Sequence, residues 1–259
     1  MEQEHKFKVD ELTLQTGQAV MLPNPPLIMT QPTLFTLGLL GQTNFYTSVV
    51  LLAYPNRAVK TNIDANFQFT DFDMLMQVMR AEDDASKVNA SLVLTLLTMI
   101  FPHYEIKIVG NMILFNQKEN NSQVIVNSEN YEIIRQAIIQ IFKLDEIAGS
   151  DTSIKKEDSP MVQRIKEKLR KRHEILAKKK LGSKIDILSR PMSIVSVGMG
   201  ISFNEIKQYT IYQLFDNYKR LQLKNEFDLY IKRATSFGGV KKNEKVTNWQ
   251  KDLDEPPDS

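Results

Sequence analysis

The sequence contains no cysteine, a single tryptophan and only three histidines among its 259 residues. Without cysteine there are no disulfides, no thiolate metal sites and no cysteine nucleophile. His5, His103 and His173 lie far apart in the sequence, and zinc-protease, nucleophile-elbow and phosphate-loop motifs are missing. We therefore expect no catalytic residue, no bound metal and no cofactor, and we interpret the protein as non-enzymatic.

Long apolar runs and a strong charge of one sign are also absent. The longest apolar runs, near residues 49–54 and 92–101, are too short to span a bilayer. The first ten residues are polar and charged, which argues against a signal peptide. The net charge of +2 gives no global reason to expect nucleic acid. These features predict a cytoplasmic protein with no membrane partner.

An acidic cluster is the one candidate for catalysis by carboxylates that belong to no known sequence motif. It consists of Asp71, Asp73, Glu82, Asp83 and Asp84. Carboxylates at these positions also cap helices and complement the positive end of the helix dipole. We favour helix capping and a solvated turn over catalysis.

The N-terminal half mixes strand and helix patterns. Residues 6–22 alternate around Thr16-Gly17 and predict a β-hairpin, followed by a short strand at residues 27–29. Pro32 then suits the start of a helix over residues 33–40. Thr70 is expected to cap a further helix, and the apolar residues 92–101 predict a helix buried on every side.

A second hairpin is expected between residues 105 and 115, with Gly110-Asn111 as its two-residue turn. Residues 123–126 predict a third strand. Ser128 is expected to cap the helix that follows, because a stripe of apolar residues then recurs at helical spacing. That stripe consists of Ile133, Ile134, Ala137, Ile138, Ile141 and Phe142.

A polar stretch rich in glycine and serine, residues 147–160, predicts a linker. We expect an α+β fold with an N-terminal mixed domain of β-hairpins and amphipathic helices at 1–146. The C-terminal domain at 161–239 is expected to be mainly α-helical, followed by a flexible acidic tail at 240–259.

The C-terminal domain is expected to begin with a strongly basic helix, which Gly182 ends. Such a helix could bind phosphates, an acidic protein, or only solvent. Because aromatic residues are not interleaved with the charges, stacking on single-stranded nucleic acid is disfavoured. The residues that could bind a polyanion or an acidic partner are Arg164, Lys168, Arg170, Lys171, Arg172, Lys178 and Lys179.

Residues 202–233 form the most organised stretch. Ser202 with Glu205 and Thr210 with Gln213 both fit the capping-box pattern, and the second predicts a helix over 211–233. Its apolar residues fall on two nearly opposite faces, so the helix either breaks near 221–224 or packs on both sides. We interpret residues 193–197, which precede this stretch, as a strand or a loop. The glycines at 198 and 200 predict a chain reversal.

The second apolar face of this helix is the candidate partner-binding surface, with Leu223, Phe227, Tyr230 and Ile231. Trp249, in the acidic tail, could anchor a short motif in a partner's groove or fold back on its own domain. The alternative for the helix is an ordinary core helix with a kink.

Four short segments stand out, at residues 28–34, 67–75, 209–216 and 246–253. They resemble segments of a family of tail-morphogenesis proteins from phages and prophages of Gram-positive hosts. The resemblance touches both halves of the chain and supplies no active site. It implies a late protein of virion assembly, either a tail assembly chaperone or a minor tail component.

From these patterns together we expect a protein-interaction factor that binds a phage tail protein, such as the tape measure, in the cytoplasm of the infected host. Self-association of the chain is an additional partner interaction to consider. One alternative is a nucleic-acid-binding phage protein that uses the basic helix at 164–180. Another is a structural component of the virion.

Overall fold

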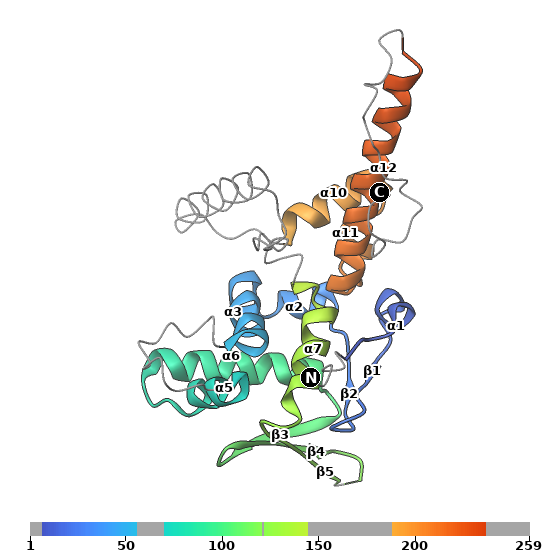
Figure 1. Cartoon of the computed structure of the whole chain (residues 1–259). Helices are drawn as coiled ribbons and strands as arrows, with labels where there is room; N and C mark the ends of the chain where they lie inside the picture. Colours follow the sequence, from blue (N-terminus) through green and yellow to red (C-terminus); the bar gives the residue numbers. More distant parts are fainter. Residues whose placement is uncertain (1–6, 56–69, 121, 145–187, 237–259) are drawn as a thin grey trace, which may run out of the picture.

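The computed structural model describes residues 7–55, 70–120, 122–144 and 188–236 (Figure 1). Helices dominate, and two small antiparallel sheets lie in the N-terminal part. The described C-terminal part, residues 188–236, is helical. The predicted α+β class, with a mixed N-terminal region and a helical C-terminal part, is therefore confirmed.

The hairpin predicted over residues 6–22 is wrong. Instead α1 (Glu11–Thr16) forms, because the Asp10 carboxylate accepts a hydrogen bond from the Thr13 N–H and caps the helix. Gly17 ends α1 at a φ of 71°, a conformation that favours glycine. The strand β1 (Val20–Met21) pairs with β2 (Ile28–Met29), which confirms the predicted short strand at 27–29.

The helices α2, α3 and α5 come next among the described residues. Thr33 caps the short α2 (Leu34–Gly38), so the predicted helix at 33–40 is shorter than expected. After Gly41, at a φ of 76°, the chain enters α3 (Gln42–Ala53). Thr70 caps α5 (Asp71–Arg80) through a capping box with Asp73, as the sequence predicts.

The helix α6 (Asp84–Ile100) begins earlier than the apolar run alone suggests, because Asp83 caps it. One face of α6 lies in the core, but Thr95 and Thr98 are exposed and each hydroxyl donates to a carbonyl four residues earlier. The expectation that residues 92–101 are buried on every side is therefore wrong.

The predicted hairpin and third strand are confirmed. Strands β3 (Tyr104–Val109), β4 (Met112–Gln117) and β5 (Gln123–Val126) form one antiparallel sheet in the order β3-β4-β5. Val109 pairs with Met112 across the two-residue turn. Gly110 occupies that turn at a φ of 55°.

The helix α7 (Tyr131–Ile141) packs its apolar stripe inward as predicted. Its N-cap is Asn130 rather than the predicted Ser128. Asn130 instead uses its side chain to accept from the Asn127 N–H and donate to the Ile125 carbonyl. These two hydrogen bonds of Asn130 stabilise the turn between β5 and α7.

The C-terminal helices are α10 (Ser189–Met199), α11 (Phe203–Ile206) and α12 (Ile211–Ala234). Residues 193–197 therefore lie in a helix, and the predicted strand or loop is wrong. Gly200 ends α10 at a φ of 67° and marks the predicted chain reversal, but Gly198 lies within α10, so the prediction is wrong for that glycine. Both predicted capping boxes, at Ser202 and at Thr210, are present.

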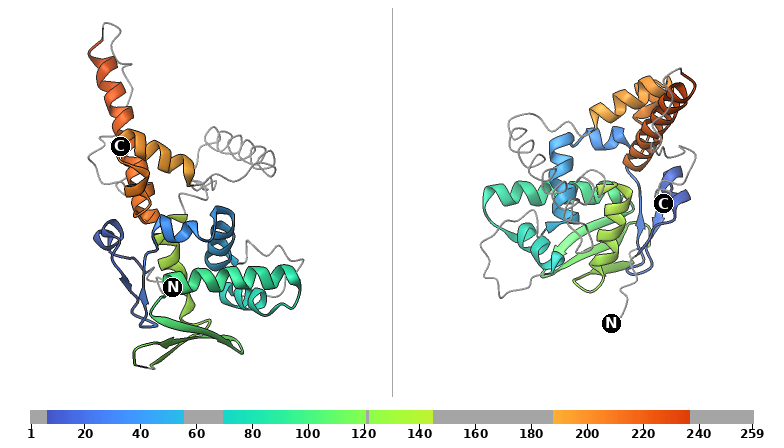
Figure 2. Two further views of the ribbon diagram at one scale, coloured as in Figure 1. Left: turned by 180° about the vertical axis from the view of Figure 1, so that it is seen from behind. Right: turned by 45° about the horizontal axis from the view of Figure 1, so that its top comes forward.

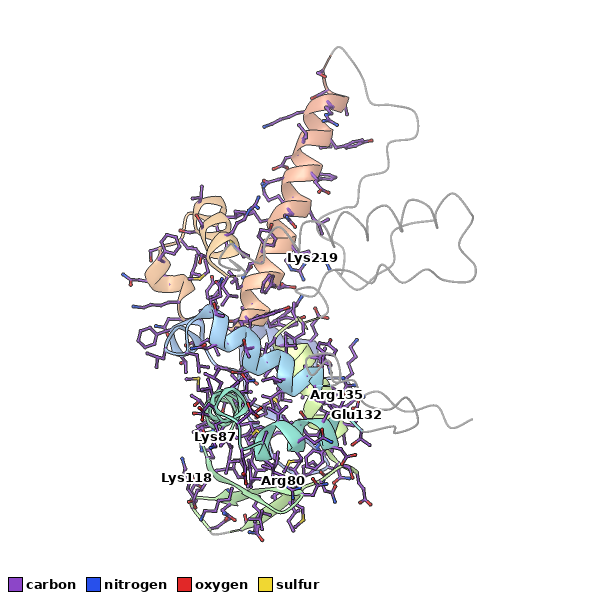
Figure 3. All side chains as sticks on the ribbon, turned by 90° about the vertical axis from the view of Figure 1, so that its left-hand side faces the viewer. Arg80, Lys87, Lys118, Glu132, Arg135 and Lys219 are labelled. Atoms are coloured by element: carbon purple, nitrogen blue, oxygen red, sulfur yellow. The ribbon has the colours of Figure 1, made fainter. Side chains whose placement is uncertain are left out.

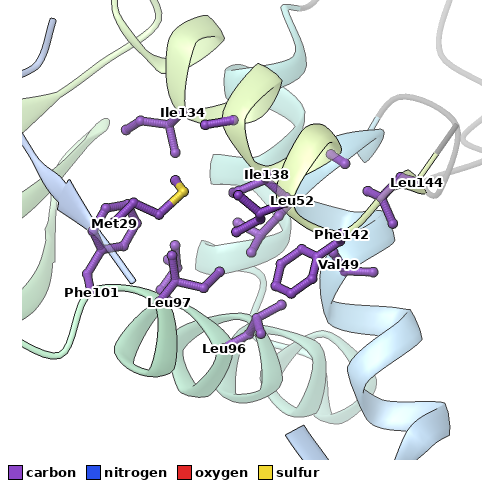
Figure 4. Close-up of a cluster of buried hydrophobic side chains, with 14 of the residues drawn as sticks. Met29, Val49, Leu52, Leu96, Leu97, Phe101, Ile134, Ile138, Phe142 and Leu144 are labelled. Atoms are coloured by element: carbon purple, nitrogen blue, oxygen red, sulfur yellow. The ribbon is translucent and has the colours of Figure 1, made fainter. Parts of the chain in front are cut away.

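One apolar core runs through the described residues. Figure 4 shows its centre, where side chains of α3, α6 and α7 meet Met29 of β2. Val195, Ile206, Ile211 and Leu214 of the C-terminal helices belong to the same cluster. The core therefore holds the N-terminal end of α12 in place. The predicted linker at 147–160 lies outside the described residues, and the division into domains stays a prediction.

Candidate protein-interaction surface

The N-terminal end of α12 is held by hydrogen bonds to distant parts of the chain. The Gln213 carbonyl oxygen Oε1 accepts from the Thr210 N–H at 2.8 Å, which completes the capping box. Gln213 Nε2 donates to the Gln15 carbonyl of α1 at 2.7 Å. The Leu34 N–H donates to the Tyr209 carbonyl at 2.8 Å, next to a β-bridge between Thr33 and Thr210. The start of α12 is therefore fixed to both α1 and α2.

A buried ion pair fixes the next turn. Asp216 is buried, and its carboxylate lies 2.9 Å from Arg220 Nε and 3.7 Å from Lys143 Nζ. Lys143 follows α7, and its Nζ also lies 4.2 Å from the centre of the Tyr212 ring. A buried carboxylate needs such partners because it is costly to remove from water. The cluster joins the end of α7 to the first half of α12.

The helix α10 covers one side of α12 as far as Leu221. A Cβ added at Gly198 would lie only 2.2 Å from Leu221 Cδ2, so the two helices approach closely at this glycine. Val195, one turn earlier on α10, is fully buried. This close contact with α10 lies about halfway along α12.

The remaining part, which we term the outer half of α12, comprises residues 222–234, and none of these residues is buried. Figures 1 and 2 show that it extends beyond the other coloured elements. In Figure 3, the side chains beyond Lys219 extend away from the body of the described structure. Leu229 and Ile231 are exposed over 49% and 42% of their surface.

An apolar stripe runs along the outer half. Leu223, Phe227, Tyr230 and Ala234 follow one another at intervals of four, three and four residues. At 100° per residue, this stripe lies about 160° around the helix from Leu221, which contacts α10. Leu223, Phe227 and Tyr230 are half-buried, and Ile231 borders the stripe. The spacing is the one that pairs a helix with a second helix.

Four of the predicted partner-binding residues, at positions 223, 227, 230 and 231, are therefore brought together on one side of the outer half. Trp249 and the predicted basic residues between 164 and 179 lie outside the described residues. Partner binding by any of these residues stays a prediction. Ordinary core packing, the alternative for this helix, applies only to its first half, where Ile211, Tyr212 and Leu214 are buried.

Sequence reasoning missed five further exposed apolar side chains on or next to α2, α10 and α11. At the contact between α2 and the residue after α11, the Phe35 N–H donates to the Lys207 carbonyl at 2.8 Å and Lys207 Nζ lies 5.6 Å from the Phe35 ring centre. Val197 is the most exposed of the five, at 83%. No sequence pattern indicates that Val197 lies on a helix, because residues 193–197 predict a strand or loop. The five residues are Phe35, Leu39, Val197, Met199 and Phe203.

The acidic cluster is largely explained by capping. The Asp73 carboxylate accepts from the Thr70 N–H, the Asp83 carboxylate accepts from the Ser86 N–H, and Asp71 Oδ2 lies 3.7 Å from Arg135 Nε. Hydrogen bonds from Thr70 lower the pKa of Asp73, and hydrogen bonds from Ser86 lower the pKa of Asp83. These carboxylates are therefore acceptors at helix starts.

Asp73 also lines a shallow depression with Gln77, Arg80 and Asn111. Within residues 7–55, 70–120, 122–144 and 188–236, no three potential metal ligands gather at one place. A search of the same residues finds no helix with the length and apolar character to cross a membrane.

A family model of the YomV second domain matches residues 183–254. The match includes α10, α11 and α12, and therefore the candidate surface. YomV is a Bacillus phage-type protein, so the match points to a phage-related protein. Comparisons with curated proteins and with solved structures gave no match.

Proposed function

We propose that this protein is a non-enzymatic interaction factor of phage tail assembly that binds another tail protein through the outer half of α12. The observation that carries the proposal is an apolar stripe on a helical segment that has no buried residue. Apolar side chains gathered on one partly exposed face are typical of protein-binding surfaces.

The spacing of the stripe favours a helical partner. Intervals of four and three residues keep Leu223, Phe227 and Tyr230 on one side, as in the seam between two packed helices. Tyr230 combines a large apolar ring with a hydroxyl, a combination that is common at the centre of interfaces. A helix of the tape-measure protein, whose apolar surface must be covered before assembly, is the proposed partner.

The way in which the N-terminal half of α12 is held in place supports the same proposal. The capping box, the buried Asp216 and the contact at Gly198 hold the first half before any partner arrives. Because less backbone freedom is lost on binding, a preorganised helix binds with a smaller entropic cost. The phage-related match over residues 183–254 and the resemblance to tail-morphogenesis proteins support the proposal that this surface acts in virion assembly.

The test is co-expression of the protein with the tape-measure protein of the same phage. We expect the wild-type chain to keep the tape-measure protein soluble and to co-purify with it. The double variant Phe227→Ser, Tyr230→Ser should lose both effects, because it removes the two largest apolar groups of the stripe.

Leu229→Ser provides the matched control. Leu229 is an exposed apolar residue of the same helical segment, but it lies about 120° around the helix from Leu223. This variant should behave like the wild type. Equal solubility of the tape-measure protein with and without the wild-type chain would contradict the chaperone activity, and detection of the chain in purified particles would favour the structural role in the virion.

A further inference from the structure

The strand β3 is an edge of the three-stranded sheet. It pairs with β4 on one side, and no described residue pairs with its other side. Figure 1 shows the sheet at the lower end of the structure and the outer half of α12 at the upper end. An open edge presents unpaired N–H and C=O groups to which another strand can bind.

The hydrogen-bond pattern identifies which backbone groups face this edge. The Lys118 N–H donates to the His103 carbonyl at 3.0 Å, so residues 103 and 118 form a hydrogen-bonded pair of the ladder. Such pairs alternate along antiparallel strands. Residues 105, 107 and 109 therefore direct their backbone groups to β4, and Ile106 and Ile108 direct theirs to the open edge. No described residue bonds to the outward groups of these two isoleucines.

Two opposite charges alternate with these isoleucines. Glu105 and Lys107 lie on the outer face of the sheet, with side chains 59% and 55% exposed, and Glu105 Oε1 lies 3.1 Å from Lys107 Nζ. An exposed pair of this kind contributes little to the stability of one chain. The two side chains instead set the order of charges along β3 that a second strand would meet on pairing.

We propose that two copies of this chain associate by antiparallel pairing of their β3 strands, centred on Ile106. In this register, the two Ile106 residues exchange backbone hydrogen bonds across the two-fold axis. The Ile108 N–H donates to the Tyr104 carbonyl of the other copy. The Tyr104 N–H takes no part, because it donates to the Phe101 carbonyl at 3.1 Å.

The charges select this register. With Ile106 at the centre, Glu105 of each copy lies opposite Lys107 of the other in a non-hydrogen-bonded pair, where side chains are closest. The neighbouring symmetric register is centred on Lys107 and places the two lysines opposite each other. Like charges directly opposite destabilise strand pairing. The order Glu-Ile-Lys is therefore complementary to itself in one arrangement.

This inference is independent of the proposed function. The sheet edge and the outer half of α12 lie at opposite ends of the described structure, so pairing at β3 leaves both copies of the stripe accessible. The dimer would therefore carry two partner-binding helices. Loss of dimerisation and loss of partner binding can be measured separately.

Analytical ultracentrifugation of the full-length chain tests the proposal. We expect a wild-type dimer whose dissociation constant rises by roughly tenfold or more in Lys107→Glu and in Glu105→Lys, because two attractive pairs become repulsive. The charge-swapped double variant Glu105→Lys, Lys107→Glu should dimerise like the wild type. Lys87→Glu, a reversal at an exposed position of α6, is the matched control and should change nothing.

Mixing the two single variants gives a second readout. Each is repelled by its own copies, but Glu105→Lys presents two lysines to the two glutamates of Lys107→Glu, so the mixture should form heterodimers. A wild-type chain that stays monomeric at about 100 µM would overturn the proposal. So would a dimer that is unaffected by the single reversals or that is not restored by the swap.

Discussion

At the scale of single residues, Tyr131 and Arg135 bind the end of a different helix. The Tyr131 hydroxyl donates to the Leu52 carbonyl, and Arg135 Nη1 donates to the Ala53 carbonyl at 3.0 Å. These carbonyls belong to the last turn of α3 and have no partner within that helix. Two side chains of α7 therefore satisfy the C-terminal end of α3.

Arg135 is held in place by Glu132, next to it in Figure 3. Its Nε and Nη2 donate to the two carboxylate oxygens of Glu132, each at 2.7 Å, and these hydrogen bonds raise the pKa of Arg135. Tyr131 is buried, and burial raises its pKa far above the ordinary range, so its hydroxyl stays a neutral donor.

The Tyr131→Phe variant should be destabilised by about 1–3 kcal/mol, because it leaves the buried Leu52 carbonyl without a partner. Urea unfolding followed by circular dichroism measures this change in the free energy of unfolding. Tyr46→Phe is the matched control and should be nearly neutral, because the Tyr46 hydroxyl makes no hydrogen bond to any residue that the structure describes. An unchanged unfolding midpoint for Tyr131→Phe would show that the bond contributes nothing to stability.

The distance between partners along the chain decides which residue roles could be predicted. The caps at Thr70, Ser202 and Thr210 were predictable because each bonds to a residue three positions away. Tyr131 reaches a carbonyl 79 residues away, and Asp216 pairs with Lys143, which follows α7. No local pattern signals contacts of that kind.

At the scale of elements, the capping box of α5 predicts a dependence of stability on pH. Hydrogen bonds from Thr70 lower the pKa of Asp73 in the folded state below its value in the unfolded chain. The ionised carboxylate therefore stabilises the fold above about pH 4, the ordinary range of an aspartate, and this contribution is lost as the pH falls through the folded pKa.

We expect Asp73→Asn to be less stable than the wild type at neutral pH and the difference to shrink below about pH 4. Thermal unfolding at a series of pH values measures it. In Asp84→Asn, which alters a carboxylate that accepts no hydrogen bond from the described residues, the pH-dependent difference should be smaller. A difference for Asp73→Asn that is constant down to low pH would contradict this role of the carboxylate.

The elements also show where periodicity misleads. Alternation over residues 6–14 predicted a strand, but Asp10 and Gly17 supply both ends of a short helix there, and these local signals prevail. The hairpin of β3 and β4 was predictable because alternation and a Gly-Asn turn agree. For α12, the sequence left a break or two-sided packing open, and the helix is continuous to Ala234.

At the scale of the whole molecule, one core joins the first and last described elements. Leu14 of α1 and Leu214 of α12 belong to the same cluster. The fold class followed from the order of strand and helix patterns, but this joint packing depends on contacts between residues 200 positions apart. The projection of the outer half of α12 could not be predicted either, because it depends on where α10 ends against Leu221.

Site-specific photocrosslinking in phage-infected cells tests most directly whether the outer half of α12 binds a tail protein. A photoreactive phenylalanine analogue placed at Phe227 should crosslink to a phage tail protein, identified by mass spectrometry, with the tape-measure protein as the expected product. The same analogue at Leu229, which lies away from the stripe, should give much less of that product. Equal yields from both positions, or no crosslink from Phe227 to any tail protein, would contradict the account.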